Sequence, residues 1–188
     1  MSVRISHVIG FDDAPFPKSH RGDVLLVGAV FSGQRLDGVV SGKVRRDGSN
    51  ATRQLVALIN DSRFRSHLQL VMLQGIAFAG FNVVDVRALS AGVRLPVLVV
   101  ARRCPDYPKI REALCTRVRG GDRKWALIER LGPMEPIAGV HVQRHGLTPD
   151  EARAVIRRTA VHGLVPEPLR VAHLIAGGIG AGHSRGRA

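Results

Sequence analysis

The stretch VLLVGAVFSGQRLDGVVSGKV, residues 24–44, decides the fold class of this chain. Its first part, residues 24–31, is a nearly continuous apolar run, which is typical of a strand covered on both faces. Ser32-Gly33-Gln34 is a turn signal, and residues 36–44 then read as the antiparallel partner strand. The stretch therefore predicts a β-hairpin inside a larger sheet.

Strands and helices alternate on both sides of this hairpin. A strand is expected over residues 3–11, interrupted by Asp12-Asp13-Ala14-Pro15, and Thr148-Pro149-Asp150-Glu151 is a typical helix start. This order predicts a mixed α/β sheet, with three early antiparallel strands, later parallel strands and flanking crossover helices. The later strands are expected at about 68–73, 95–101 and 137–142, and the helices at about 51–60, 83–91, 105–119, 149–162 and 167–176, with 123–131 extending or following the third helix.

The composition indicates one soluble domain. The 188 residues are enough for a single ordinary domain, and 45% hydrophobic with 23% charged residues exclude a wholly disordered or collagen-like chain. No run of about 18 apolar residues and no secretory signal pattern occurs, so we expect a cytoplasmic protein without a membrane partner. Residues 1–176 should form the domain, followed by a flexible Gly/Arg-rich tail over 177–188. Cys104 and Cys115 indicate two reduced thiols.

The charge indicates a nucleic-acid partner. The chain has 28 Lys and Arg against 15 Asp and Glu, a formal net charge of +13. Most of the basic residues are arginine, which binds phosphate with a bidentate fork. Arg45-Arg46 and Arg102-Arg103 follow predicted strands, at the edge where open α/β sheets place ligands. They are candidate contacts to a DNA or RNA backbone, and solvated strand ends are the alternative explanation.

A pair of carboxylates ends the first predicted strand. Asp12 and Asp13 offer the oxygen ligands that Mg²⁺ takes, although Asp-Asp-Ala-Pro is also an ordinary way to leave a strand. A zinc site at His141 and His145 is disfavoured, because these residues lie in predicted strand and turn and not on one helix face. The glycine-rich residues 177–182 follow a helix instead of joining a strand to one, which disfavours a phosphate-binding loop.

Three motifs resemble the endonuclease V superfamily: IGFDD at residues 9–13, LQGIA at 73–77 and PEPLRVAH at 166–173. The longer phrases LDGVVSGKVRRDGSNAT, GIAFAGFNVVDV and PEPLRVAHLIAGG are similar to the signatures of an uncharacterised, mainly archaeal family related to endonuclease V. The resemblance covers nearly the whole chain. It implies a ribonuclease H-like fold, whose order of strands is the one predicted above.

The resemblance also implies a site. Asp12 matches the first-strand aspartate with which endonuclease V-like enzymes hold a divalent metal, and Asp47 matches the second acid loosely. His173 matches a histidine of the superfamily, and an ordinary helix histidine is the alternative. The implied catalytic residues are Asp12, Asp47 and His173, and the implied ligands of Mg²⁺ or Mn²⁺ are Asp12, Asp13 and Asp47. Arg170, within the third motif, joins the candidate nucleic-acid contacts.

The chain departs from the endonuclease V pattern at two points. Gln74-Gly75 stands where the pattern expects Asp-Gly, and the amide of Gln74 offers an oxygen without a charge. A charge pair at about 4 Å is worth roughly 4 kcal/mol at an effective dielectric near 20, so the substitution weakens a metal site unless Asp13 or Asp85 compensates. The second departure is the lack of a Pro-Tyr-Ile-Pro-type wedge. Specificity for inosine is therefore not carried over from the resemblance.

Three hypotheses of function follow. The first is a nucleic-acid-binding protein of endonuclease V type that hydrolyses phosphodiesters with Mg²⁺ or Mn²⁺. The second is a non-catalytic nucleic-acid-binding module that lost its metal site at Gln74. The third is a domain that binds a small molecule or a protein, whose binding would be insensitive to salt.

Overall fold

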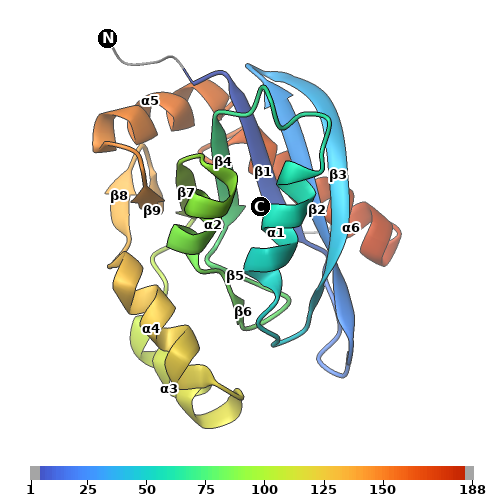
Figure 1. Ribbon diagram of the computed structural model, residues 1–188, viewed down its shortest axis with the longest axis vertical. Coiled ribbons are helices and arrows are strands. Elements are labelled where there is room, and N and C mark those ends of the chain that lie inside the picture. The colour runs from blue at the N-terminus through green and yellow to red at the C-terminus, as the bar shows by residue number, and fades with distance from the viewer. Residues whose placement is uncertain (1–4, 185–188) are drawn as a thin grey trace.

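The computed structural model describes residues 5–184, which form one large sheet with helices on both faces (Figure 1). The strand order in this sheet is β3-β2-β1-β4-β7-β9-β8. The strands are β1 His7–Asp13, β2 Asp23–Ser32, β3 Arg35–Arg45, β4 Leu70–Gln74, β7 Val97–Ala101, β8 Glu135–Ile137 and β9 Val140–His145, and a separate small hairpin pairs β5 Ala77–Phe78 with β6 Asn82–Val83. The helices are α1 Ala51–Asn60, α2 Val86–Val93, α3 Tyr107–Arg117, α4 Gly121–Leu131, α5 Pro149–Thr159 and α6 Glu167–Ala181.

The first three strands form the predicted antiparallel unit. β2 pairs with β1 on one side and with β3 on the other, with Gly28 opposite both Phe11 and Val40. The apolar run of β2 is buried along almost its whole length, because it lies between two neighbouring strands and under helix α6. Both the mixed α/β class and this hairpin are therefore confirmed.

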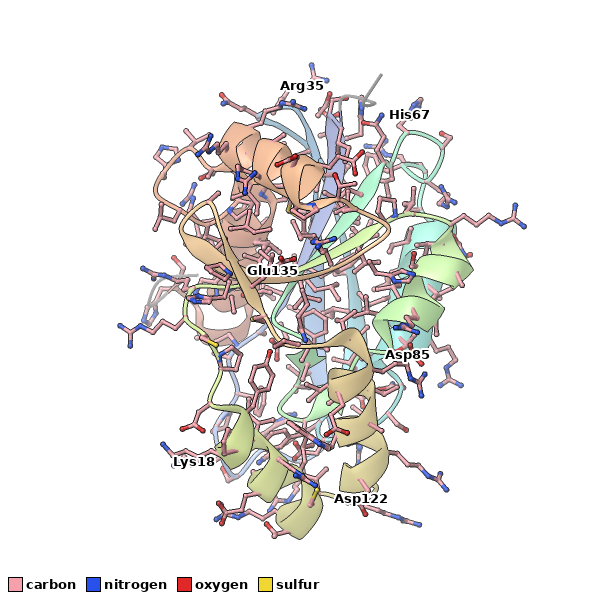
Figure 2. All side chains as sticks on the ribbon, turned by 90° about the vertical axis from the view of Figure 1, so that its left-hand side faces the viewer. Lys18, Arg35, His67, Asp85, Asp122 and Glu135 are labelled. Atoms are coloured by element: carbon pink, nitrogen blue, oxygen red, sulfur yellow. The ribbon has the colours of Figure 1, made fainter. Side chains whose placement is uncertain are left out.

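β4 and β7 join the sheet parallel to β1. The chain reverses direction between β1 and β2 and again between β2 and β3, so β3 runs parallel to β1. The strands β1, β3, β4 and β7 therefore all end at one edge of the sheet, which we call the carboxyl edge. Figure 2 shows Arg35, at the start of β3, and His67, before β4, at the opposite end of the molecule from Lys18 and Asp122. Side chains at the ends of several strands are therefore collected at the carboxyl edge.

The two faces of the sheet are covered by different helices (Figure 1). On one face α1 and α2 pack against the odd-numbered core residues Phe11, Leu73 and Val99. On the other face α5 and Leu169 of α6 pack against even-numbered residues such as Met72 and Leu98. Since side chains alternate along a strand, this pattern assigns each strand-end residue to a face.

Two hairpins of the structure replace simpler predictions. A single last strand was expected over residues 137–142, whereas β8 and β9 form an antiparallel hairpin that pairs with β7 at the edge of the sheet. The helix expected from residue 83 begins at Val86, because the β5–β6 hairpin, which the sequence did not predict, precedes it. Both turns have two consecutive residues at positive φ, Ala138-Gly139 in the two-residue β8–β9 turn and Ala79-Gly80 in the three-residue β5–β6 turn. Alanine is uncommon at that position, so the sequence signal was weak.

Helix boundaries also differ from the expected ones. Residues 105–131 form two helices, because Gly120 adopts a left-handed conformation (φ 71°) between α3 and α4. α6 extends to Ala181, although we expected the helix to end at Ala176 and a flexible tail to follow. Gly180 lies against Ala14, where an added Cβ would be 2.9 Å from the Ala14 Cβ. This close contact fixes the last turn of α6 against the β1–β2 connection, and residues 185–188 lie outside the described residues.

Candidate active site

The centre of the candidate site is a buried carboxylate paired with a histidine. Asp12 lies on β1 next to its end, is 6% exposed and, as an even-numbered residue, belongs to the α6 face. Its Oδ2 lies 2.8 Å from His173 Nδ1 on α6, and its Oδ1 accepts a hydrogen bond from the Asp13 backbone N–H at 2.9 Å. With a proton on Nδ1, His173 donates to the carboxylate. Residues 161 positions apart in the sequence are thus brought into direct contact.

A glycine makes this contact possible. Gly10 lies under the first turn of α6, where an added Cβ would be 2.5 Å from the Pro168 carbonyl carbon. From Gly10 to Asp12 β1 advances about 6.6 Å, and from Pro168 to His173 the helix advances about 7.5 Å. Because β1 and α6 advance by similar distances from the Gly10–Pro168 contact, His173 lies level with Asp12.

Asp13 follows Asp12 on β1 and lines the same cavity, and its carboxyl also reaches the β5–β6 hairpin. Its Oδ2 accepts a hydrogen bond from the Ala79 N–H at 2.7 Å, in the turn of the β5–β6 hairpin. Burial, and next the negative charge of Asp12, raises the pKa of the Asp13 carboxyl to about 7. Asp13 therefore holds the turn, and burial beside a second carboxylate disfavours its ionised form.

Asp47 holds the same turn from the end of β3. Its Oδ1 accepts from the Phe81 N–H at 2.9 Å, and its own N–H donates to the Ala79 carbonyl at 2.9 Å. Lys124 donates from Nζ to the Asp47 carbonyl at 2.6 Å. The structure thus places Asp47 on the hairpin turn, outside the residues that line the cavity at Asp12. Within residues 5–184, no group of three or more His, Cys, Asp or Glu side chains is arranged to hold a metal ion.

Gln74 is the neighbour of Asp12 on the next strand. β1 pairs in parallel with β4 up to Phe11 and Leu73, so the following residues, Asp12 and Gln74, lie side by side on the α6 face. The Oε1 atom of Gln74 is buried and has no hydrogen-bond partner among the described residues. Asp85 does not compensate, because its Oδ1 caps α2 by accepting from the Ala88 N–H at 3.0 Å (Figure 2). The unpartnered oxygen beside Asp12 is a feature that the sequence could not show.

The carboxylate opens onto a cavity of about 650 Å³, which we call the acidic cavity. Its polar walls are Asp12, Asp13, His173 and His183, and its other walls come from residues 14–16 and the end of α6. His183 belongs to residues 177–188, for which the sequence predicted a flexible tail. The structure places it beside Asp12 because α6 continues past the expected end.

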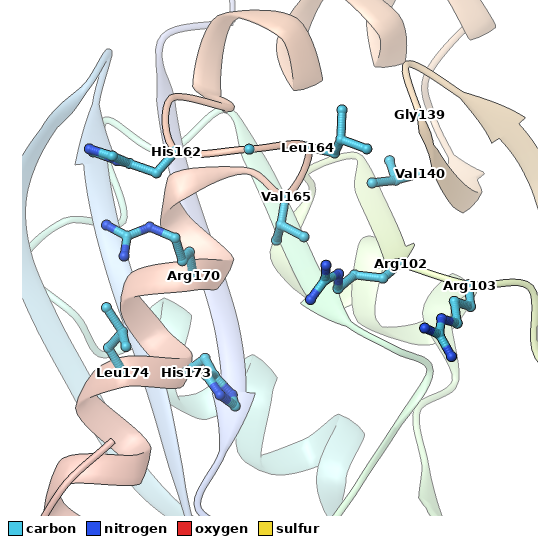
Figure 3. A pocket seen from close by; sticks show the side chains of 11 residues that line it. Arg102, Arg103, Gly139, Val140, His162, Leu164, Val165, Arg170, His173 and Leu174 are labelled. Atoms are coloured by element: carbon cyan, nitrogen blue, oxygen red, sulfur yellow. The ribbon is translucent and has the colours of Figure 1, made fainter. Parts of the chain in front are cut away.

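A second hollow lies on the other side of His173, with a volume of about 490 Å³. We call it the basic pocket, and its polar walls are Arg102, Arg103, His162, Arg170 and His173 (Figure 3). His173 lines both hollows, so the basic pocket and the acidic cavity are neighbours.

The candidate arginines differ in how far they are already engaged. Arg170 donates to both oxygens of Glu167, at 2.7 and 2.8 Å, and this pairing holds the pKa of the Glu167 carboxyl below its usual range. Arg46 binds the carbonyls of Lys18 and His20 and stabilises the β1–β2 connection. The remaining candidates, Arg45, Arg102 and Arg103, are exposed at the carboxyl edge.

Comparison with solved structures identifies the class of fold. The chain resembles a protein of unknown function from Archaeoglobus fulgidus with a TM-score of 0.86 and 30% identity, over 93% of this chain and 98% of the other. It also resembles endonuclease V of Ciona intestinalis, solved with DNA containing an inosine followed by a ribo-adenosine, with a TM-score of 0.57 and 14% identity over 90% and 83% of the two chains. The fold is the ribonuclease H-like fold of endonuclease V, as the resemblance implied.

Comparison of sequences identifies the family. Residues 4–180 match the family described as endonuclease dU, and the chain belongs to it. A UPF0215 protein of Deinococcus radiodurans is 58% identical over 184 residues, 98% of this chain and 94% of its own. A UPF0215 protein of Methanothermobacter thermautotrophicus is 43% identical over 185 residues, 96% and 91% of the two chains. The expected membership of an endonuclease V-like, mainly archaeal family is confirmed. In the described part of the chain, no helix is long and apolar enough to span a membrane.

Proposed function

We propose that this protein is an endonuclease that hydrolyses a phosphodiester of nucleic acid at the Asp12–His173 pair. The observation that carries the proposal is the position of this pair. A buried carboxylate, held in one orientation by a histidine 2.8 Å away, opens onto a cavity at the carboxyl edge of a ribonuclease H-like sheet. Open α/β sheets place ligands at that edge. The description of the family as endonuclease dU supports DNA containing deoxyuridine as the substrate.

The residues at Asp12 fit one divalent cation with a mostly hydrated shell. Mg²⁺ takes oxygen ligands, keeps several waters and needs only one or two carboxylates in addition to substrate phosphate. Asp12 supplies the carboxylate, and the buried, unpartnered Oε1 of Gln74 supplies a second protein oxygen beside it. Asp47 is engaged by the β5–β6 turn, so it does not extend this donor set. Mg²⁺ or Mn²⁺ bound there would polarise the phosphate and lower the pKa of a water molecule.

The side chains of the chain itself have distinct tasks in this proposal. His173 fixes the rotamer of Asp12 through Nδ1, so the carboxylate is oriented before substrate arrives. Asp13 and Asp47 both hold the β5–β6 turn, and Asp13 also lines the acidic cavity beside Asp12. The exposed Arg102 and Arg103 neutralise backbone phosphates that approach along the carboxyl edge.

The alternative function is binding of nucleic acid without cleavage. The observation that favours it is Gln74, a neutral side chain next to Asp12 where a second acid would strengthen a metal site. The positive net charge would still attract nucleic acid if no cation bound. The two functions differ in whether the unmodified chain cuts.

The experiment is a cleavage assay on labelled single- and double-stranded DNA and RNA, in Mg²⁺ or Mn²⁺. Each strand carries one deoxyuridine, one inosine or neither. We expect cleavage of the deoxyuridine DNA and a loss of at least about 100-fold in Asp12→Asn, since positioned catalytic groups usually contribute that much. Asp61→Asn, an exposed residue at the end of α1, is the matched control and should cut normally.

Each of the other outcomes has a definite meaning. Cleavage only in the Gln74→Asp variant would identify a binding module derived from a nuclease. Cleavage that persists in Asp12→Asn would place the reaction elsewhere. Binding that does not weaken as salt rises would contradict a nucleic-acid partner altogether.

A further inference from the structure

The basic pocket has two walls of different chemistry. One wall is cationic and contains Arg102 and Arg103, the two residues that follow β7. The other wall is apolar and contains Val140, Leu164 and Val165. In Figure 3, the side chains of Arg102 and His173 extend toward one another from two different elements, with Val165 above them in this view.

The cationic wall is suited to a phosphate group. None of the described residues that line the pocket is a carboxylate. Glu167 lies buried behind it, bound by Arg170 and, at 3.2 Å, by His162. The charges of Arg102 and Arg103 therefore remain uncompensated at the pocket. Guanidinium groups bind phosphate oxygens through charge-assisted hydrogen bonds.

The apolar wall is suited to an apolar group that is attached to the phosphate. Val140 and Val165 are buried, whereas Leu164 leaves 59% of its surface exposed at the rim. Gly163, next to Leu164, also lines the pocket. A volume of about 490 Å³ lies within the usual range of small-molecule sites, which combine apolar walls with a few polar groups. A planar ring attached to a phosphate fits this combination.

We propose that the basic pocket binds one unpaired nucleotide, with its phosphate on Arg102 and Arg103 and its base against Val140, Leu164 and Val165. Because His173 lines both this pocket and the acidic cavity, the nucleotide lies next to the phosphodiester that faces Asp12. The role as a subsite for cleavage rests on the proposed function, whereas the binding of a nucleotide does not.

The test is an NMR titration of the ¹⁵N-labelled full chain with deoxyuridine 5′-monophosphate, deoxyribose 5-phosphate or inorganic phosphate. We expect the nucleotide to shift the amide signals of residues 139–140 and 162–165 and to bind more tightly than the other two ligands. Equal binding of all three would show a simple anion site and would overturn the proposal. The absence of shifts at millimolar nucleotide would also overturn it, because the method detects affinities that weak.

Variants separate the two walls. Arg102→Gln with Arg103→Gln should weaken all phosphate-containing ligands by about 10- to 100-fold, the usual effect of losing charged hydrogen bonds. Leu164→Ser should weaken only the nucleotide. Arg117→Gln with Arg119→Gln removes the same charge from exposed positions outside the pocket and should have little effect. An equal loss in this control would indicate a general charge effect and would contradict the site.

The two proposals fail in distinguishable ways. Cleavage by a chain that binds no nucleotide in this pocket would overturn the further inference and leave the proposed function intact. Nucleotide binding by a chain that cuts no substrate would do the reverse. The ligands of the titration contain no bond between nucleotides, so the binding measurement does not depend on cleavage activity.

Discussion

The backbone of Pro168 lies directly against Gly10, so closely that a Cβ on Gly10 would be 2.5 Å from the Pro168 carbonyl carbon. No flexible side-chain end is available to move aside, because the contact is with backbone. The position of α6 over β1, and with it the Asp12–His173 contact, therefore depends on the absence of a side chain at residue 10.

Gly10→Ala should displace α6 and lower the free energy of unfolding by about 1–3 kcal/mol, the usual cost of overpacking. Urea unfolding measures this change. Gly178→Ala is the matched control on the same helix, because nothing lies within 4 Å of its added Cβ. The control should be neutral or more stable by up to about 1 kcal/mol, since alanine favours helix. Equal stability of the two variants would contradict the close approach.

Asp47→Asn should retain both the fold and the proposed cleavage. Asparagine keeps an oxygen that accepts from the Phe81 N–H, and it tolerates the left-handed backbone of this position, where φ is 51°. Asp47→Ala loses the acceptor and should lower the free energy of unfolding by about 1–3 kcal/mol. Thermal unfolding and the cleavage rate are measured together. Loss of cleavage in a stably folded Asp47→Asn would restore Asp47 as a metal ligand.

Gln74→Met should stabilise the metal-free protein. The change removes a buried oxygen that has no hydrogen-bond partner in the described chain and keeps a side chain of similar length, so a gain of about 1 kcal/mol is expected. The measurement is urea unfolding in EDTA. Added Mn²⁺ should then raise the stability of the unmodified chain more than that of the variant, because the variant lacks one ligand oxygen. A variant less stable than the unmodified chain in EDTA would show that the oxygen is already satisfied.

The Glu167–Arg170 pair should make stability depend on acid pH. Hydrogen bonding to Arg170 is the largest cause that lowers the pKa of the Glu167 carboxyl below its ordinary value of 4.5. The folded chain therefore binds the proton less readily than the unfolded chain, and the stabilisation is present above about pH 4.5 and lost as pH falls.

Glu167→Gln should lower the free energy of unfolding by about 1–3 kcal/mol at pH 7, because Arg170 loses its charged partner. The loss is limited because Arg170 is partly exposed and solvent screens its charge. The difference from the unmodified chain should shrink below pH 4.5. The measurement is urea unfolding at several pH values. A constant difference across this range would rule out the ionised pair as its origin.

The sequence alone determined the class of fold and the position of most elements. The apolar run of β2 is typical of a strand buried on both faces, and the helix expected over residues 51–60 matches α1 from end to end. Such signals are local, because they depend on which faces of one segment avoid water. The short motifs around Asp12 and His173 also indicated the family, since they reflect residues close together in the sequence.

Which of the candidate residues lie together was decided only by the tertiary structure. Asp12, Asp13 and Asp47 are alike as sequence letters, yet Asp12 contacts His173, Asp13 lines the same cavity while holding the β5–β6 turn, and Asp47 lies only at that turn. The reason is that the partners of these carboxylates, His173 on α6 and the β5–β6 turn, come from segments distant in the sequence. Similarly, the unpartnered oxygen of Gln74 and the two walls of the basic pocket exist only where strands and α6 meet. Sequence patterns report the burial of single segments, whereas contacts between distant segments require the packed sheet.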